Sequence, residues 1–267
     1  KLKILKVKFD KVTLKEATKT ALKWANEENQ HYITTPNPEI LLASQKNDKF
    51  LTVLNRADLN IADGTGIIWA AKFKEITKNE TFKTIKFYKF LKTLFAIPFN
   101  QKYLSSELPE RVTGTDLMQE ICKKTDQSVF LLGAGEKIAE IAAEKLKKGN
   151  QTLNIVGTYS GSPNLKDEKP IISKINNSGA KILFVAFGAP SQELWIARNL
   201  KKLATVKLAI GVGGAFDYIA EEKKRAPKLM QKTGLEWLYR LIQEPKRIKR
   251  ILNATLLFPI KVYKKNI

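Results

Sequence analysis

Histidine and cysteine are almost absent from this chain of 267 residues, which has one of each, His31 and Cys122. One cysteine cannot form a disulfide within the chain, and two such residues cannot supply the ligands of a structural zinc site. A Ser-His-Asp triad would depend on His31, and the sequence lacks the Gly-x-Ser-x-Gly turn that could carry its nucleophile. Cys122 stands in a run with helical spacing, so we expect a small buried side chain and a reducing compartment. Acid–base chemistry must therefore rest on aspartate or glutamate.

Long apolar runs are absent as well. No stretch approaches the roughly 18 apolar residues that a helix needs to cross a bilayer. Residues 1–9 alternate lysine with leucine, isoleucine, valine and phenylalanine, which is typical of a half-buried strand and unlike the apolar centre of a signal peptide. We expect a cytoplasmic protein without a spanning segment.

Acidic residues are few relative to basic ones. The chain has 47 lysines and arginines against 26 aspartates and glutamates, a net charge of +21. Such an excess indicates an anionic partner, which is a nucleic acid, a membrane surface or a phosphate-bearing substrate, unless it reflects only the codon bias of an AT-rich genome. A nucleic-acid-binding protein is suggested by charge alone, because no DNA- or RNA-binding motif accompanies it. The chain also lacks Asp-x-Asp, the usual carboxylate pair for a metal-bridged diphosphate.

What is present is an alternation of short β-branched runs with helical stretches. The predicted strands are residues 31–35, 59–62, 128–133, 153–157, 181–188 and 206–211, and helices are predicted at 136–148, 169–178 and 192–204. This alternation predicts an α/β fold, a Rossmann-like parallel sheet covered by helices on both faces. We expect a core at residues 1–220 and a basic helical C-terminal appendage at 221–267.

Glycine or small polar residues end or follow the predicted strands, among them Thr35, Asn37, Gly133, Gly213 and Gly214. The carboxyl ends of parallel strands form the ligand crevice, where glycines let the backbone approach a phosphate. The pattern therefore predicts a nucleotide or phosphate ligand, and tight turns are the alternative explanation for any single glycine.

Gly133-Ala134-Gly135 resembles the start of a dinucleotide fingerprint. Ile138 stands where the third glycine belongs, and no acidic residue follows the next strand to hold a ribose. A nucleotide-binding oxidoreductase is therefore only an alternative hypothesis.

Asp63 is the leading candidate for acid–base catalysis. It follows the apolar run 59–62 and precedes Gly64, so its carboxylate should lie at the mouth of the crevice. A carboxylate beside apolar walls is suited to take a proton from a hydroxyl nucleophile. The alternative is an aspartate that caps a helix starting near Thr65.

An ordered set of motifs extends along nearly the whole chain. It comprises Thr35-Pro36-Asn37-Pro38-Glu39, Ala62-Asp63-Gly64-Thr65-Gly66, Arg111-Val112-Thr113-Gly114-Thr115-Asp116, Leu131-Leu132-Gly133, Phe187-Gly188-Ala189-Pro190-Ser191-Gln192-Glu193, Gly211-Val212-Gly213-Gly214-Ala215-Phe216-Asp217, Lys224-Arg225-Ala226-Pro227, Gly234-Leu235-Glu236-Trp237-Leu238-Tyr239-Arg240-Leu241 and Glu244-Pro245-Lys246-Arg247. In these motifs the chain resembles the WecG/TagA/CpsF glycosyltransferases, glycosyltransferase family 26. One departure is Glu221-Glu222, which follow Ala220 where the family usually has glycine.

The resemblance implies an inverting, metal-independent transferase without a cofactor. It would move an N-acetylmannosamine-type sugar from a UDP donor to undecaprenyl-diphosphate-linked N-acetylglucosamine at the cytoplasmic membrane face, in teichoic acid or related polysaccharide synthesis. Family analogy makes Asp63 the general base. We expect Thr35, Asn37 and Gln192 to line the sugar pocket, because each stands at a strand end with hydrogen-bonding capacity.

The C-terminal segment 235–267 is basic and amphipathic. From residue 221 onward the chain has a net charge of +9, and projection of residues 235–252 separates an apolar stripe from the arginines. The stripe is Trp237, Leu238, Leu241, Ile248 and Leu252. We expect this segment to dock on an anionic membrane, with Arg225, Arg240 and Arg247 toward the acceptor diphosphate or the leaving UDP. The alternative is an ordinary helix pair that closes the core.

Residues 72–102 are a second basic and aromatic stretch, with eight lysines against two glutamates, and the sequence assigns no role to it. Homo-oligomerisation stays open.

Overall fold

Parallel strands form the centre of the molecule, as the spacing of the apolar runs predicts. The computed structural model describes residues 1–265, and within them a six-stranded sheet has the order β4-β3-β8-β7-β5-β6. Its strands are β3 (His31–Thr34), β4 (Leu59–Asn60), β5 (Val129–Gly133), β6 (Ile155–Tyr159), β7 (Ile182–Ala186) and β8 (Leu208–Gly211). Every neighbouring pair is parallel. The predicted Rossmann-like α/β fold is confirmed.

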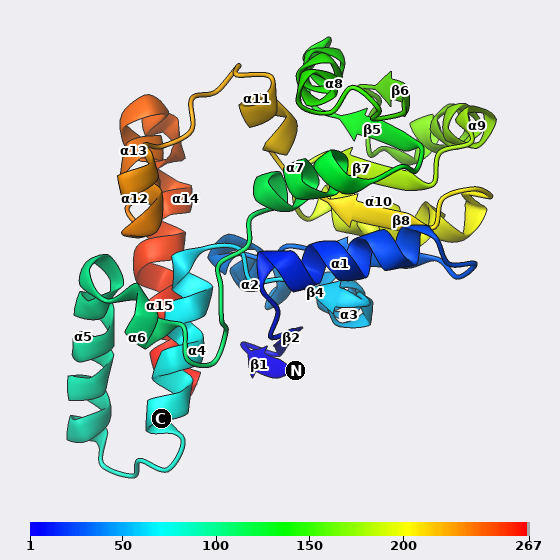
Figure 1. Ribbon diagram of the computed structural model, residues 1–267. Helices are drawn as coiled ribbons and strands as arrows, with labels where there is room; N and C mark the ends of the chain where they lie inside the picture. Colours follow the sequence, from blue (N-terminus) through cyan, green and yellow to red (C-terminus); the bar gives the residue numbers. More distant parts are fainter. Residues whose placement is uncertain (266–267) are drawn as a thin grey trace.

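Helices cover both faces of this sheet (Figure 1). One face packs against α1 (Leu14–Ala25), α7 (Gly114–Lys124), α8 (Ile138–Gly149) and the short α11 (Ala215–Ile219); the other packs against α9 (Glu168–Ser178) and α10 (Ser191–Asn199). Alternate side chains of a strand point to opposite faces, so Phe184 joins the first cluster whereas Leu183 joins the second. Burial on both faces explains why the strand sequences are almost continuously apolar.

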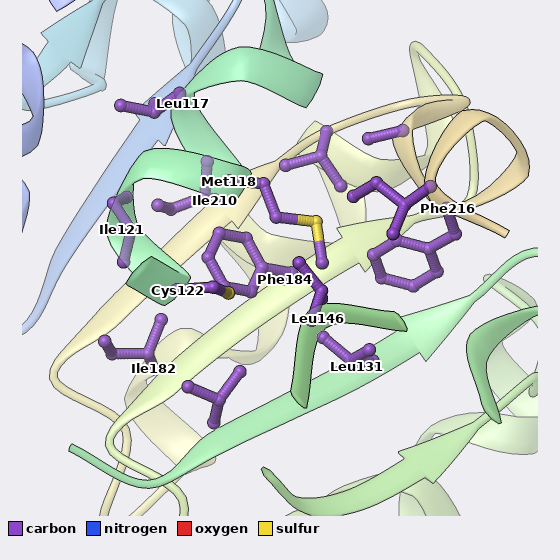
Figure 2. Close-up of a cluster of buried hydrophobic side chains, with 14 of the residues drawn as sticks. Leu117, Met118, Ile121, Cys122, Leu131, Leu146, Ile182, Phe184, Ile210 and Phe216 are labelled. Carbon is purple, nitrogen blue, oxygen red and sulfur yellow. The ribbon is translucent and has the colours of Figure 1, made fainter. Parts of the chain in front are cut away.

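Cys122 lies inside the first of these clusters. Figure 2 shows it on α7 beside Met118, with Phe184 of β7 facing them across the cluster. Burial raises the pKa of the Cys122 thiol to about 12, so the thiolate needed for nucleophilic chemistry does not form at neutral pH. The expectation of a small buried side chain at Cys122 is confirmed.

A second apolar core lies beyond the edge of the sheet. It is built from β1 (Leu2–Ile4), β2 (Val7–Phe9), α2 (Pro38–Ser44), α3 (Asp48–Arg56), α4 (Thr65–Thr77), α5 (Lys83–Phe99), α6 (Gln101–Leu104) and α15 (Phe258–Lys265). Trp69 is fully buried at its centre, with the rings of Phe73, Phe90 and Phe258 around it. Aromatic rings in edge-to-face contact add about 0.5–1.5 kcal/mol per pair beyond their buried area.

The C-terminal residues form a column of helices beside the sheet (Figure 1). It contains α12 (Lys228–Lys232), α13 (Glu236–Gln243) and α14 (Ile248–Leu252), and a π-helical turn (Asn253–Leu257) joins α14 to α15. Pro245 separates α13 from α14, as expected from its effect on helices. Phe258 and Val262 are buried in the second core, so the end of the column is packed against the rest of the chain.

Two local features differ from the simplest interpretation of the sequence. Residues 1–9 do not form one strand, because β1 and β2 pair as an antiparallel hairpin that turns at Leu5 and Lys6 with φ of 42° and 71°. That turn has neither glycine nor asparagine, which usually mark it. At the departure from the family pattern, Glu221 has φ of 63°, a left-handed conformation that glycine adopts more easily.

Candidate active site

A cavity of about 380 Å³ opens at the carboxyl ends of neighbouring strands β4, β3, β8 and β7. Parallel strands end at the same edge of a sheet, so loops that are far apart in the sequence meet there. The predicted site residues that line this cavity are Thr35, Asn37, Asp63, Gln192, Gly213, Gly214, Arg225, Arg240 and Arg247. Gly133 ends β5, one strand further along the sheet, and is not among the residues that line the cavity.

Asp63 is positioned by the turn between β4 and α4. Its backbone N–H donates to the Pro36 carbonyl at 3.1 Å, which ties the ends of β4 and β3 together. Gly64, not Asp63, is the N-cap of α4, and within residues 1–265 no side chain caps this helix. The alternative that Asp63 caps the helix is therefore wrong, and its carboxylate is left to face the cavity.

The electrostatic environment of Asp63 makes it a weaker acid than usual. Burial by the surrounding residues raises its pKa to about 6, against the opposing attraction of Arg111 and Arg240. The carboxylates of Glu236 and Asp116 raise this pKa further. A group with this pKa is ionised at neutral pH and binds a proton more readily than a solvated aspartate, which suits a general base.

Thr35 and Asn37 occupy the loop after β3. The Thr35 hydroxyl donates to the carbonyl oxygen of Gly211 at 3.3 Å and so links the ends of β3 and β8. Asn37 is the N-cap of α2, and its side-chain oxygen accepts from the Ile40 N–H at 3.0 Å. Across residues 1–265 the amide nitrogen of Asn37 forms no hydrogen bond, so a donor remains at the cavity wall.

Gln192 is held at the start of α10 between two glycine loops. Its side-chain oxygen accepts from the Gly188 N–H at 3.2 Å and from the Gly213 N–H at 3.0 Å. Its side-chain nitrogen donates to the carboxyl oxygen of Glu193 at 2.8 Å. Glu193 is fully buried, and burial raises its pKa to about 7. Gln192 therefore fixes the loops after β7 and β8 against each other, and its predicted contact with the sugar stays a prediction.

The arginines at the cavity are paired with carboxylates from other elements. Arg225 donates two hydrogen bonds to Asp116, at 2.5 and 2.8 Å. Glu236, which is 8% exposed, accepts from Arg240 at 2.5 Å and from Arg111 at 3.1 Å. Although burial opposes ionisation of Glu236, these two guanidinium groups outweigh it and lower its pKa. The cluster is therefore an ordered array of cations whose remaining N–H groups are available to an anion.

Two further arginines belong to the same wall. Arg247 donates to Glu244 at 2.6 Å, and Arg250 donates to Glu39 at 2.7 Å. Arg247, Arg250 and Glu39 line the cavity, whereas Glu244 does not. In residues 1–265 the Nε of Arg240 is buried without a hydrogen-bond partner. An unsatisfied cationic N–H in a buried position is costly, and this guanidinium adds positive charge beside the cavity.

The sequence did not single out the acidic residues that pair with these arginines. Asp116, Glu236 and Glu244 all stand within the motifs quoted above, and motif membership was the only signal for them. No spacing along the chain could reveal that Arg225 meets a residue on α7 or that Arg111 meets one on α13.

A second cavity, of about 370 Å³, also has Asp63 in its wall. Its walls are mostly apolar and include Trp69, Leu94, Ile97, Pro98, Leu235, Trp237, Ile251, Ala254 and Pro259. Both cavities are lined by Asn37, Glu39, Asp63, Glu236, Arg240 and Arg247. We call them the polar cavity and the apolar cavity; Asp63 is one of the residues that join them.

Among residues 1–265 no group of three or more histidine, cysteine, aspartate or glutamate side chains is arranged to hold a metal ion. No helix in that part of the chain has both the length and the apolar character to cross a bilayer.

Comparison with known proteins identifies the family of the chain. The sequence model of the glycosyl transferase WecG/TagA/CpsF family matches residues 2–97 and 96–267. A Staphylococcus aureus protein named N-acetylglucosaminyldiphosphoundecaprenol N-acetyl-beta-D-mannosaminyltransferase is 30% identical over 269 residues, which cover 99% of this chain and 91% of the relative. A Bacillus spizizenii protein of the same name is 29% identical over 225 residues, 83% of this chain and 75% of the relative. The chain is a glycosyltransferase and belongs to the WecG/TagA/CpsF family.

Proposed function

We propose that the enzyme transfers an N-acetylmannosamine-type sugar from a UDP donor to undecaprenyl-diphosphate-linked N-acetylglucosamine, with inversion and without a metal ion. The relatives in Staphylococcus aureus and Bacillus spizizenii are named for this acceptor and this sugar. The observation that carries the proposal is the position of Asp63 at the junction of a polar and an apolar cavity. The donor and a lipid-linked acceptor require walls of opposite character, so the two substrates would meet at this junction. A base is needed there to remove the proton from the acceptor hydroxyl.

The polar cavity suits the nucleotide-sugar. It lies at the carboxyl ends of the strands, where loops that contain Gly188, Gly213 and Gly214 let the backbone approach a phosphate. Arg225, Arg240 and Arg247 supply guanidinium groups around the same space. Thr35 and Asn37 lie near Asp63 along the same wall, and we assign them to the sugar.

The apolar cavity suits the part of the acceptor that joins the diphosphate to the lipid. Its walls of tryptophan, leucine, isoleucine and proline would exclude water from the first isoprene units. Arg111 lines this cavity and not the polar one, and we assign its guanidinium to the acceptor diphosphate. The acceptor hydroxyl would then approach Asp63 from the side opposite the donor.

The proposed reaction is a direct displacement. The ionised carboxylate of Asp63 removes the proton from the acceptor hydroxyl as its oxygen bonds to the anomeric carbon. The bond between that carbon and the diphosphate oxygen breaks on the opposite face, and UDP leaves with the bonding electron pair. Attack opposite the leaving group inverts the configuration. A well-placed general base contributes about 10²–10⁴ to the rate.

Cations of the protein would stabilise the departing diphosphate. The arginines at the polar cavity are already oriented by Asp116, Glu236 and Glu244, so little reorganisation is needed when negative charge develops. We assign these arginines the role that a divalent ion has in other glycosyltransferases.

The C-terminal segment is proposed to hold the enzyme at the cytoplasmic face of the membrane as a peripheral protein. Trp237, Leu238, Ile248 and Leu252 are 37%, 36%, 46% and 45% exposed, so this apolar stripe is only partly covered by the chain itself. The same segment supplies Arg240 and Arg247 to the polar cavity. We propose residues 1–220 as the α/β glycosyltransferase core and 221–267 as the acceptor-facing appendage.

Transfer from UDP-N-acetylmannosamine to a short-chain lipid diphosphate acceptor tests the function. The proposal requires product formation in EDTA, an inverted anomeric linkage by NMR and loss of at least about 10²-fold in rate for Asp63→Asn. A variant of near-parental rate, or a strict need for Mg²⁺ or Mn²⁺, contradicts the mechanism. Comparing UDP-N-acetylmannosamine with its uronic acid and with UDP-glucose as donors identifies which sugar the enzyme transfers.

Thermal stabilisation separates this function from its alternatives. UDP should raise the melting temperature and NAD should not, because only a ligand of the folded protein shifts it. Stabilisation by NAD would instead favour the oxidoreductase. Salt-sensitive binding of random oligonucleotides does not discriminate, because a net charge of +21 predicts it for any function.

A further inference from the structure

Helix α5 presents large apolar side chains to solvent. Ile85, Tyr88, Leu91, Phe95 and Phe99 are 41%, 63%, 38%, 72% and 86% exposed, and they follow one another at spacings of three and four residues. That spacing places them on one side of the helix, which we call the α5 outer face. Single exposed apolar residues are ordinary, but a continuous face of five marks an interaction site.

Polar contacts on the inner side hold α5 in this orientation. Thr93 is fully buried, and its hydroxyl oxygen accepts from Trp69 Nε1 at 3.0 Å. Lys89 Nζ donates to the carboxylate of Glu80 at 2.9 Å. Turning the helix to bury the phenylalanines would break these contacts and leave the indole N–H of Trp69 without an acceptor. The outward position of the apolar residues is therefore built into the packing.

The charge around the outer face is positive. Lys83 and Lys92 are exposed on α5, and the sequence has no aspartate or glutamate between Glu80 and Glu107. Exposed aromatic and aliphatic side chains bordered by lysines are the composition of helices that lie in the interface of an anionic bilayer. The same lysines would also attract a partner protein with an acidic apolar groove. Lipid is favoured because α5 also lines the apolar cavity.

The inner side of α5 also forms a wall of the apolar cavity. Leu94, Ile97 and Pro98 line that cavity together with Asp63. In Figure 1, α5 lies on the side of the molecule away from the six-stranded sheet. One helix thus contributes to an exposed apolar face and to the apolar space next to the catalytic carboxylate.

We propose that the α5 outer face docks in the headgroup region of an anionic bilayer. This surface is separate from the C-terminal stripe and belongs to the segment 72–102, to which the sequence assigned no role. The purpose of docking rests on the proposed function, since it would bring the apolar cavity to the lipid-linked acceptor. The binding itself requires neither the donor nor the acceptor.

Vesicle sedimentation without substrates tests the proposal. A Phe95→Ser/Phe99→Ser variant should bind vesicles of phosphatidylglycerol and phosphatidylcholine at least tenfold more weakly than the parent, a change of about 1.4 kcal/mol. An Ile141→Ser/Leu165→Ser variant is the matched control, because these residues are also exposed, at 38% and 72%, but lie on α8 and beside α9. The control should bind like the parent. Parental binding by the α5 variant, or an equal loss in the control, overturns the proposal.

A second readout follows the position of the helix directly. Cys122 is the only cysteine and is buried, so a Phe95→Cys variant can be labelled at residue 95 alone with an environment-sensitive fluorophore. Its emission should shift to the blue on anionic vesicles, and an unchanged emission from bound protein contradicts insertion of α5. Light scattering tests whether a second copy of the chain occupies the α5 outer face instead of lipid. A parent dimer that becomes monomeric in the Phe95→Ser/Phe99→Ser variant would make this face a dimer interface and overturn the proposal. An inactive enzyme that still binds through α5 would contradict the proposed function and leave docking intact.

Discussion

An Asp63→Asn variant should unfold at a higher temperature than the parent protein while losing most of its transfer activity. Burial raises the pKa of Asp63 from 3.8 to about 6 in the folded chain. At neutral pH the fold therefore holds a carboxylate that it would hold more favourably as the neutral acid. Two pKa units correspond to about 3 kcal/mol, and the opening of the residue toward the cavity reduces the expected gain to about 1–3 kcal/mol. Asparagine has the same shape without the charge.

The stability advantage of Asp63→Asn over the parent should increase as the pH rises. The pKa of Asp63 is raised by folding, so the unfolded chain releases this proton first, and the parent loses stability as pH rises from about 4 to about 6. Above about pH 7 both states are ionised, and the advantage of asparagine is constant. At about pH 4.5 the folded carboxyl is mostly protonated, so the advantage should shrink to about a third. Thermal unfolding at both pH values measures the difference.

A second aspartate of the same cavity is the control for this experiment. Asp217 lies 3.5 Å from Lys223 Nζ, so Asp217→Asn removes an ion pair and should not raise the melting temperature. Transfer to the short-chain acceptor is assayed in parallel, and loss of about 10²–10⁴ in rate is expected only if Asp63 is the base. The reasoning fails if Asp63→Asn is destabilising at neutral pH, or if its effect on stability is the same at both pH values.

Further predictions address neighbouring features of the site. The kcat/KM for transfer should fall toward low pH with a midpoint near 6, the pKa of Asp63. Glu236→Gln should move that midpoint lower, because removal of this carboxylate lowers the pKa of Asp63. A midpoint that moves upward contradicts the assignment of Asp63 as the base. Gln192→Leu should abolish the thermal shift produced by UDP, since two glycine N–H groups lose their acceptor, and scanning fluorimetry of the variant checks this. Glu221→Gly should increase the free energy of unfolding by about 0.5–1 kcal/mol in urea titrations, because residue 221 has a φ of 63°; a destabilised variant would show that the ion pair with Lys145 matters more.

Most of the sheet could be predicted from the sequence because its strands are buried on both faces. Such strands are short apolar runs separated by helices of regular length, and that pattern is local. The N-terminal hairpin could not be predicted, since Leu5 and Lys6 adopt left-handed conformations that their side chains do not favour. Packing decides there: Ile4, Leu5, Val7 and Phe9 are all buried in the second core, which compensates for the turn.

The location of the site was predictable and its charge pairing was not. A general rule places ligands at the carboxyl ends of parallel strands, so Thr35, Asp63 and Gly213 could be grouped before their contacts were known. The pairs Arg225–Asp116 and Arg111–Glu236 join residues 109 and 125 positions apart. They depend on where α7 and α13 lie in the folded chain, and no periodicity carries that information. Gln192 was assigned to the sugar for its hydrogen-bonding capacity, yet its amide is bonded to two backbone N–H groups and to Glu193.

The orientation of α5 shows a limit of periodicity that has consequences for function. Helical spacing identifies which residues share a side of a helix, but it does not say which side meets the protein. In α5 the buried Trp69 decides, because its indole N–H needs an acceptor and Thr93 supplies one. With Thr93 turned inward, Phe95 and Phe99 must point outward, and Leu94 must face the apolar cavity. If the outer face lies in a bilayer, an acceptor that leaves the lipid phase along α5 would keep its lipid against apolar walls, while Arg111 meets its diphosphate and Asp63 deprotonates its hydroxyl.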